Sequence, residues 1–397
     1  MKSAPRQEAD LAQQGLGIRR KVTDMRVFNC DACGHPVFFD SVQCVHCGAT
    51  LAFLPERLHV ACLRPVSGRR DSVLWESLSS LTGGKPSGRL YKMCSHRGPV
   101  GQCNFALPAD DPHALCESCR QTRWLPDLSD PANALRWTRI EAAKRQLFYT
   151  LARLGLGPRP GEDGPRFELL ADLPGQAPVM TGHANGTITL NVVEADDAER
   201  ARRRQALHEP YRTLVGHLRH ESGHFFWDRL VVGAGRVEEF RNLFGDERQD
   251  YGQALQNYYA RDPLDGQWRD NFVSAYATSH PWEDWAESWA HYLHMVDLLE
   301  TAASYGTCIT MPGGSGTGTG SGTQPALCVQ DPFAVKARPD FGTMLDQWVP
   351  LTLLTNSLNR SLGHGDAYPF ALSAGARRKL EFVHAAVNAS AARQASF

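Results

Sequence analysis

The distribution of cysteine strongly limits how the N-terminal part of this chain can fold. Eleven cysteines occur in 397 residues, and nine of them lie before residue 120. The first 25 residues are polar and lack the apolar stretch of a secretory signal. An odd, clustered set of cysteines in such a chain indicates metal ligands in a reducing compartment rather than a disulfide framework. We therefore expect a cytoplasmic protein whose N-terminal region folds around metal ions.

Two Cys-x-x-Cys pairs come first along the chain: Cys30 with Cys33, and Cys44 with Cys47. A glycine follows each pair, which suits a tight turn in which backbone N–H groups point at thiolate sulfur. Four thiolates from two such turns can surround one Zn²⁺ ion tetrahedrally. The spacing predicts a zinc ribbon, against the alternative of four unrelated buried thiols.

A second set of four cysteines lies within 26 residues: Cys94, Cys103, Cys116 and Cys119. Only the last two form a Cys-x-x-Cys pair, so this set is less regular. We predict a second structural zinc, with His96 or His113 as an alternative to one of the four ligands. The competing interpretation is one such pair beside two ordinary core thiols. Cys62 is left over, and we expect it to act as a small buried apolar residue.

The charge balance limits the class of partner. Lysine and arginine total 42 and aspartate and glutamate 43, which gives a formal net charge of −1. A chain so balanced is not built to coat nucleic acid or an acidic membrane. Hydrophobic residues make up 42% and charged residues 21%, as in globular proteins. No uncharged apolar stretch reaches 18 residues, so we predict no membrane-spanning segment.

Hydrophobic periodicity predicts an α+β chain: a small β region with four-cysteine zinc sites, then a mainly helical domain with a small sheet. We divide the chain into a flexible segment 1–25, a zinc-ribbon region 26–130 and a domain 131–397, in which 311–324 is a flexible Gly/Ser/Thr loop. The predicted helices of this domain are 133–156, 341–363 and 373–389, and the predicted strands are 167–173 and 186–193.

The segment 209–231 contains the motif His220-Glu221-Ser222-Gly223-His224, and its apolar residues recur with helical periodicity. On a helix, residues four apart share a face, so His220 and His224 can bind one metal ion. Glu221 then projects beside the metal and can take a proton from water that the metal activates. The alternative is a surface helix that carries two ordinary histidines.

A third ligand is expected from the segment 280–300, which is predicted to be helical and in which Glu283 and Glu287 are four residues apart. One carboxylate can complete a site of two imidazoles and one carboxylate, and the other can hydrogen-bond a ligand imidazole. Interleaved tryptophans argue that these acids are buried, and a buried carboxylate needs a partner such as a metal. The alternative interpretation places them on an exposed helix, near its N-terminus.

These motifs resemble a bacterial family of zinc-binding metallopeptidases with an N-terminal zinc-ribbon domain. The resemblance extends from about Cys30 into the C-terminal helices and includes HPWEDWAESWAHYLH. More distantly, the two helical motifs together are similar to the gluzincin arrangement of thermolysin-like enzymes. That similarity implies that Glu283 is the third zinc ligand and that Glu287 supports a ligand histidine. The chain departs from the thermolysin pattern in carrying Glu rather than Asp at position 287.

Other residues near these motifs are candidates for catalysis or binding. Tyr276 precedes the second motif, and some gluzincin-like peptidases place a tyrosine in this neighbourhood to stabilise an oxyanion; a packed aromatic is the alternative. His280 is a second candidate for that role, or for a metal ligand. His291 and His294 leave a different choice of ligands open.

Two further features complete these expectations. We treat His208 and His217 as surface histidines. The strand at 187–193 is a candidate edge strand for binding an extended substrate.

Two functional hypotheses follow. The first is a zinc-dependent hydrolase, most simply a metallopeptidase, with one catalytic and one or two structural zinc ions and a peptide or protein substrate. In it the ribbons are structural or contact a protein partner. The second is an adaptor whose ribbons bind protein or nucleic acid and whose histidine site is structural or vestigial. The intact Glu221 favours the hydrolase, because a purely structural site does not need it.

Overall fold

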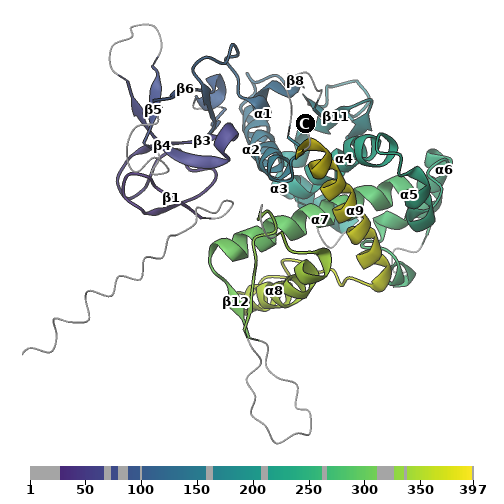
Figure 1. Cartoon of the computed structure of the whole chain (residues 1–397). Helices are drawn as coiled ribbons and strands as arrows, with labels where there is room; N and C mark the ends of the chain where they lie inside the picture. The colour runs from purple at the N-terminus through teal and green to yellow at the C-terminus, as the bar shows by residue number, and fades with distance from the viewer. Residues whose placement is uncertain are drawn as a thin grey trace, which may run out of the picture.

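The computed structural model describes residues 27–66, 73–78, 88–98, 101–157, 164–206, 213–261, 266–310, 326–334 and 338–395. Within them, an N-terminal β region with two four-cysteine clusters is followed by a mainly helical region with small sheets, as predicted (Figure 1). The predicted segments 1–25 and 311–324, and His208, lie outside the described residues. No helix in the described ranges is long and apolar enough to cross a membrane.

The N-terminal region consists of a short hairpin and a five-stranded antiparallel sheet. The hairpin is β1 (Phe28–Asn29) and β2 (Pro36–Val37). The sheet has the order β3 (Thr50–Leu54), β4 (His59–Pro65), β5 (Trp75–Ser77), β6 (Leu90–Met93) and β7 (Ala106–Pro108). A bridge between Phe53 and Phe105 brings β3 beside β7, so the sheet curls back on itself. Both faces of β3 and of most of β4 are buried, which explains why the sequences of these strands are almost continuously apolar.

The ribbon region and the helical region share a core. The rings of Phe39 and Phe53 lie 5.4 and 5.8 Å from the ring of Tyr149 on the first long helix, α2 (Pro131–Arg153). The Tyr149 hydroxyl donates a hydrogen bond of 2.9 Å to Glu300 on helix α7 (Pro281–Ser304). These contacts fix the zinc ribbon against the helical region.

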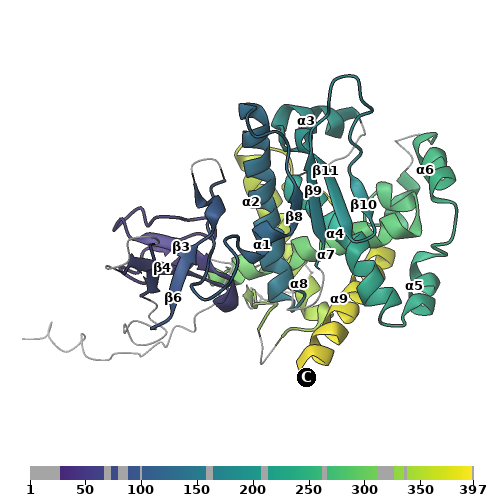
Figure 2. The same ribbon diagram turned by 90° about the horizontal axis from the view of Figure 1, so that it is seen from above.

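Among the described residues the short helix α1 (Glu117–Arg120) lies in the ribbon region, and eight α-helices follow in the helical region: α2 (Pro131–Arg153), α3 (Asp197–Ala206), α4 (Leu214–Trp227), α5 (Val237–Phe244), α6 (Tyr251–Tyr259), α7 (Pro281–Ser304), α8 (Phe341–Ser361) and α9 (Ala374–Ala395). Its sheet has the order β10 (Gly182–Ala184), β11 (Thr187–Asn191), β9 (Arg166–Leu170) and β8 (Thr122–Trp124). Figure 2 shows these strands side by side, with α4 next to them and α7 beyond.

The prediction that the strand at 187–193 is an edge strand is wrong. β11 pairs with β10 on one side and with β9 on the other, so it is central in the sheet. The edges are β8 and β10; β10 is antiparallel to β11 and was not predicted from the sequence. Three residues are too short a segment for hydrophobic alternation to reveal, which explains why the pattern pointed to the longer strand.

The two late cysteines, whose pairing was not predicted from the sequence, are bonded to each other. Cys308 and Cys328 form a disulfide across the pair β12 (Cys308–Ile309) and β13 (Leu327–Cys328). The clustering of the first nine cysteines predicted that they do not form disulfides, and all nine are free thiols. It allowed no inference about the pairing of two isolated cysteines 20 residues apart.

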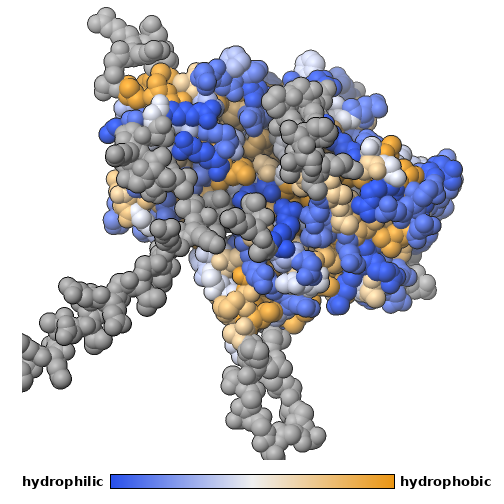
Figure 3. Space-filling model, in the orientation of Figure 1, coloured by the Kyte–Doolittle hydropathy of each residue, from blue (hydrophilic) through white to orange (hydrophobic). Residues whose placement is uncertain are grey.

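Hydrophobic residues gather on the surface near α8 (Figure 3). Leu353 and Leu358 on this helix are 52% and 57% exposed, and Leu362, directly after it, is 75% exposed. The rest of the visible face is largely polar, with smaller apolar areas between.

Candidate metal centre

The central helix α4 carries the first two candidate ligands. It begins after Thr213, whose hydroxyl oxygen accepts a hydrogen bond from the N–H of Gly216 and caps the helix. His220 and His224 follow one turn apart on the same face, with their rings 5.2 Å apart.

Close packing of α4 against α7 brings the third candidate to these histidines. A Cβ atom at Gly223 would lie 2.9 Å from the Ala286 Cα atom, so only glycine allows this approach. The indole N–H groups of Trp285 and Trp289 donate to the Gly223 carbonyl and the Ser222 hydroxyl at 2.8 and 3.1 Å. The two helices are thereby fixed in register, with the first turn of α7 beside the histidines.

Glu283 lies in that first turn and completes a group of three ligand atoms, all within 4.8 Å of one another. Its Oε2 is 2.9 Å from His220 Nε2, and its Oε1 is 3.5 Å from His224 Nε2. Two atoms bound tetrahedrally to zinc at about 2.05 Å are roughly 3.3 Å apart. The donor set and its spacing therefore fit a zinc ion.

Glu287 is placed behind a ligand rather than in the ligand group. Its Oε1 lies 2.7 Å from His220 Nδ1, and its Oε2 accepts a hydrogen bond of 2.5 Å from the Ser274 hydroxyl. A carboxylate in this position holds the proton on Nδ1 and leaves Nε2 free for a metal. The glutamate at this position thus makes the contact expected of the supporting acid.

The electrostatics of the group reflect a cation site. Burial opposes charge on His220, but the carboxylates of Glu283 and Glu287 outweigh it and raise the pKa of His220 well above its usual value. Burial likewise opposes ionisation of Glu283, but the histidines lower its pKa to about 2. Burial also opposes ionisation of Glu287, but neighbouring side chains, His220 above all, lower its pKa, so both buried carboxylates stay ionised beside the histidines.

Tyr251, on α6, was missed by the sequence analysis. Its hydroxyl donates a hydrogen bond of 2.8 Å to Glu283 Oε1, so it orients a candidate ligand. Tyr276 lies close by, with its ring 5.8 Å from that of His220. Burial and the nearby Glu283 carboxylate raise the pKa of Tyr276, so its phenol keeps its proton and can donate it in a hydrogen bond.

His280 occupies a structural position. It caps α7: its Nδ1 accepts a hydrogen bond from the Trp282 N–H at 3.1 Å. Its Nε2 lies 3.2 Å from the Gln249 carbonyl oxygen, to which it donates. Both ring nitrogens are thus engaged in these contacts, and His280 does not belong to the group of His220, His224 and Glu283; its role as an oxyanion donor stays a prediction.

The alternative histidines on α7 also have other contacts. His291 Nδ1 lies 2.5 Å from the Tyr368 hydroxyl, and His294 Nδ1 lies 2.5 Å from an Arg219 guanidinium nitrogen. Neither belongs to the group of three ligand atoms. The choice of ligands that the sequence left open is therefore narrowed to His220, His224 and Glu283.

The expectation that His217 is a surface histidine is wrong. Its Nε2 lies 3.2 Å from Glu221 Oε1, and its side chain is 17% exposed. The spacing of these residues, four apart on a helix, was the signal that could have identified the contact. Glu221 itself is buried and lies outside the group of three ligand atoms.

A further histidine, His183, approaches the site from the sheet. It lies on the edge strand β10, with its ring stacked 6.2 Å from that of His224. Among the described residues its buried Nε2 has no hydrogen-bond partner. No sequence motif marks this residue.

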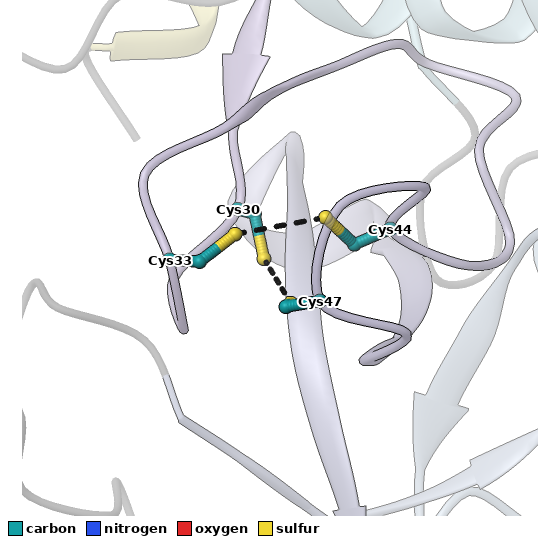
Figure 4. A group of neighbouring side chains, drawn as sticks. All are labelled: Cys30, Cys33, Cys44 and Cys47. Atoms are coloured by element: carbon teal, nitrogen blue, oxygen red, sulfur yellow. Dashed lines mark hydrogen bonds between the residues drawn. The ribbon is translucent and has the colours of Figure 1, made fainter.

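The cysteines form two separate clusters in the ribbon region. In the first, the four thiols point toward one another, with Sγ–Sγ distances of 3.6 Å for Cys30 and Cys47 and 3.7 Å for Cys33 and Cys44 (Figure 4). Sulfur atoms bound tetrahedrally to zinc at about 2.3 Å are roughly 3.8 Å apart. Cys62 is buried as expected, and its Sγ lies 3.2 Å from that of Cys30.

The second cluster consists of Cys94, Cys103, Cys116 and Cys119, all buried. The Sγ atom of Cys103 lies 3.8 Å from the Sγ atoms of both Cys116 and Cys119. His113 pairs instead with Asp111 at 2.9 Å, and neither it nor His96 is in the cluster. Both clusters therefore have the donor set and spacing of a four-cysteine zinc site.

Comparison with known proteins agrees with this geometry. A family described as "Putative zinc-binding metallo-peptidase" matches residues 133–386, more than half of the chain. The chain belongs to this family. A zinc-ribbon domain family matches residues 27–130. No solved structure matched the chain.

Relatives of this metallopeptidase family member occur in mycobacteria. Uncharacterized proteins of Mycobacterium bovis and Mycobacterium tuberculosis are 38% identical over 370 residues. The match covers 92% of this chain and 96% of each relative, so it includes the ribbon and the helical region together.

Proposed function

We propose that this protein is a zinc-dependent hydrolase that cleaves peptide bonds. The observation that carries the proposal is that the ligand group and the candidate base are separate. His220, His224 and Glu283 form the ligand group, while Glu221, next to His220 on α4, lies outside it. A structural site needs only ligands, whereas a hydrolytic site also needs a base.

The residues have distinct roles in this proposal. His220, His224 and Glu283 hold the zinc ion, and Tyr251 and Glu287 fix the ligands Glu283 and His220 by hydrogen bonds. Zinc bound there supplies Lewis-acid chemistry, because it polarises a carbonyl group and makes water more acidic.

The remaining steps belong to the chain's own side chains. Glu221 accepts the proton of the attacking water and transfers it to the departing amide nitrogen. The neutral phenol of Tyr276 donates a hydrogen bond to the oxygen that becomes negatively charged.

The substrate is proposed to bind in an extended conformation along β10. This strand is one of the two edges of its sheet and lies against α4, and His183 on it stacks near His224. An edge strand offers unpaired N–H and C=O groups to a peptide backbone. A peptide or protein is therefore the substrate class that we propose.

The zinc ribbon is proposed to support the fold and to contact a protein partner. Phe38 and Val45, close to the cysteines of the first cluster, are 55% and 89% exposed. The near-zero net charge makes nucleic acid an unfavourable partner. We also propose that the protein acts in the cytoplasm.

The test compares wild-type protein with Glu221→Gln on a broad peptide library. We expect zinc at the three clusters, cleavage by the wild type, and loss of cleavage in Glu221→Gln with its zinc content unchanged. In a matched ligand variant, His224→Ala, both cleavage and one zinc ion should be lost. A wild-type protein with every site loaded that cleaves no peptide would contradict the proposal and favour the adaptor.

A further inference from the structure

The carboxylate of Glu221 is held by a histidine one turn earlier on the same helix. His217 Nε2 lies 3.2 Å from Glu221 Oε1, and Glu221 is only 6% exposed. A glutamate side chain has three rotatable bonds, so an unheld carboxylate samples several positions. The contact with His217 restricts the position of one carboxylate oxygen of Glu221, Oε1.

The imidazole of His217 is itself held from the opposite side. Its Nδ1 lies 3.7 Å from Oε2 of Glu194, a residue that is 1% exposed. Glu194 belongs to a short 3₁₀ turn, Val192–Ala195, directly after the central strand β11. The position of His217 is therefore set by the sheet as well as by α4.

Glu194 is anchored in turn by two arginines of α3. Arg203 pairs with its carboxylate, and Arg200 donates a hydrogen bond of 2.8 Å to its backbone carbonyl. The result is a chain of contacts, Arg203–Glu194–His217–Glu221, that runs from α3 through the turn after β11 to the metal-ligand helix. Charges alternate along this chain when His217 is protonated, so each contact favours the next.

We propose that His217, held by Glu194, is a positioning residue that orients the Glu221 carboxylate. This inference rests on the proposed function only where catalysis is measured, because orientation of Glu221 also governs how the site binds small ligands. A hydroxamate is a suitable probe, because it binds zinc through its oxygens and offers an N–O–H proton to a neighbouring carboxylate.

The experiment measures the affinity of the zinc-loaded full-length protein for acetohydroxamate by titration calorimetry. His217→Leu removes the contact, and we expect about tenfold weaker binding, since a hydrogen bond to a charged group is lost. His217→Asn is too short to reach Glu221 and should behave alike, which keeps the test intact if the leucine variant does not fold. His217→Gln can place an amide N–H near the position of Nε2 and should recover most of the affinity.

Two controls separate positioning from other effects. His364→Gln changes an exposed histidine in the loop after α8 and should leave the affinity unchanged. Zinc content should be the same in all variants, because His217 is not in the ligand group. Unchanged acetohydroxamate affinity in folded His217→Leu or His217→Asn would overturn the inference.

The catalytic arm uses any peptide that the wild type cleaves. There, His217→Leu should lower kcat at least tenfold with little change in KM, since the residue orients the base rather than the substrate. Failure of the wild type to cleave peptides would refute the proposed function alone, because the acetohydroxamate measurement does not depend on turnover.

Discussion

Replacing Gly223 with alanine tests whether the close approach of α4 and α7 builds the metal centre. The new Cβ atom would lie 2.9 Å from the Ala286 Cα atom and 3.0 Å from Trp289 Cδ1, whereas ordinary contact begins near 3.4 Å. The helices must therefore separate by about 0.5 Å, because a backbone atom cannot rotate away as a side chain does. The same movement would carry Glu283 away from His220 and His224.

The expected magnitude follows from two opposing terms. Overpacking of a buried contact costs about 1–3 kcal/mol, and the upper part of that range applies when the obstacle is backbone. Alanine gains about 1 kcal/mol over glycine in a helix interior. We therefore expect Gly223→Ala to lower the free energy of unfolding by about 1–2 kcal/mol and to weaken zinc binding.

The assay is urea unfolding of the zinc-loaded and metal-free protein, together with a zinc competition titration. Gly252→Ala on α6 is the matched control, since its Cβ atom would meet only the Asp250 Oδ1 atom at 3.5 Å. The control should be neutral or stabilising. If Gly223→Ala is as stable as wild type and binds zinc equally well, the reasoning about helix approach is refuted.

Three further changes have defined outcomes. Glu287→Ala removes the 2.7 Å contact with His220 Nδ1, so zinc affinity at the centre should fall about 10–100-fold, and an unchanged affinity in a chelator competition would argue against the supporting role. Cys103→Ser should release one zinc ion and lower the melting temperature, whereas intact zinc content by metal analysis would remove Cys103 from the ligands. Burial, partly offset by Glu287, lowers the pKa of His291 from 6.5 to about 4; the folded state then disfavours the protonated ring, so the free energy of unfolding should fall as the pH falls from about 6.5 toward 4. Urea unfolding at pH 7 and pH 5 measures this, and His291→Phe should show a smaller difference than wild type; an equal difference would contradict the assignment.

The third metal ligand could be predicted only in part from the sequence. The spacing of Glu283 and Glu287 predicted that one acid binds the metal and the other supports a histidine, and the resemblance to gluzincins assigned the two roles. The structure places the two acids on opposite nitrogens of His220. It also places His280 outside the ligand group, with both of its ring nitrogens engaged.

Other features of the site left no signal that periodicity could detect. Tyr251 reaches Glu283 from a nine-residue helix with no buried residue, and His183 reaches His224 from a three-residue strand. Both contacts join elements that are distant in sequence. The disulfide between Cys308 and Cys328 is similar, because two isolated cysteines carry no information about their pairing.

The sequence alone determined the local chemistry of this protein. Cys-x-x-Cys pairs and histidines one helical turn apart fix their ligand geometry within a few residues, since a turn or a helix turn suffices to align them. Only the tertiary structure decided which carboxylate faces the histidines, which strands form the edges of the sheet, and that Tyr251 contacts Glu283. These outcomes depend on how α4 packs against α7 and against the sheet, and that packing is set by contacts between segments tens of residues apart.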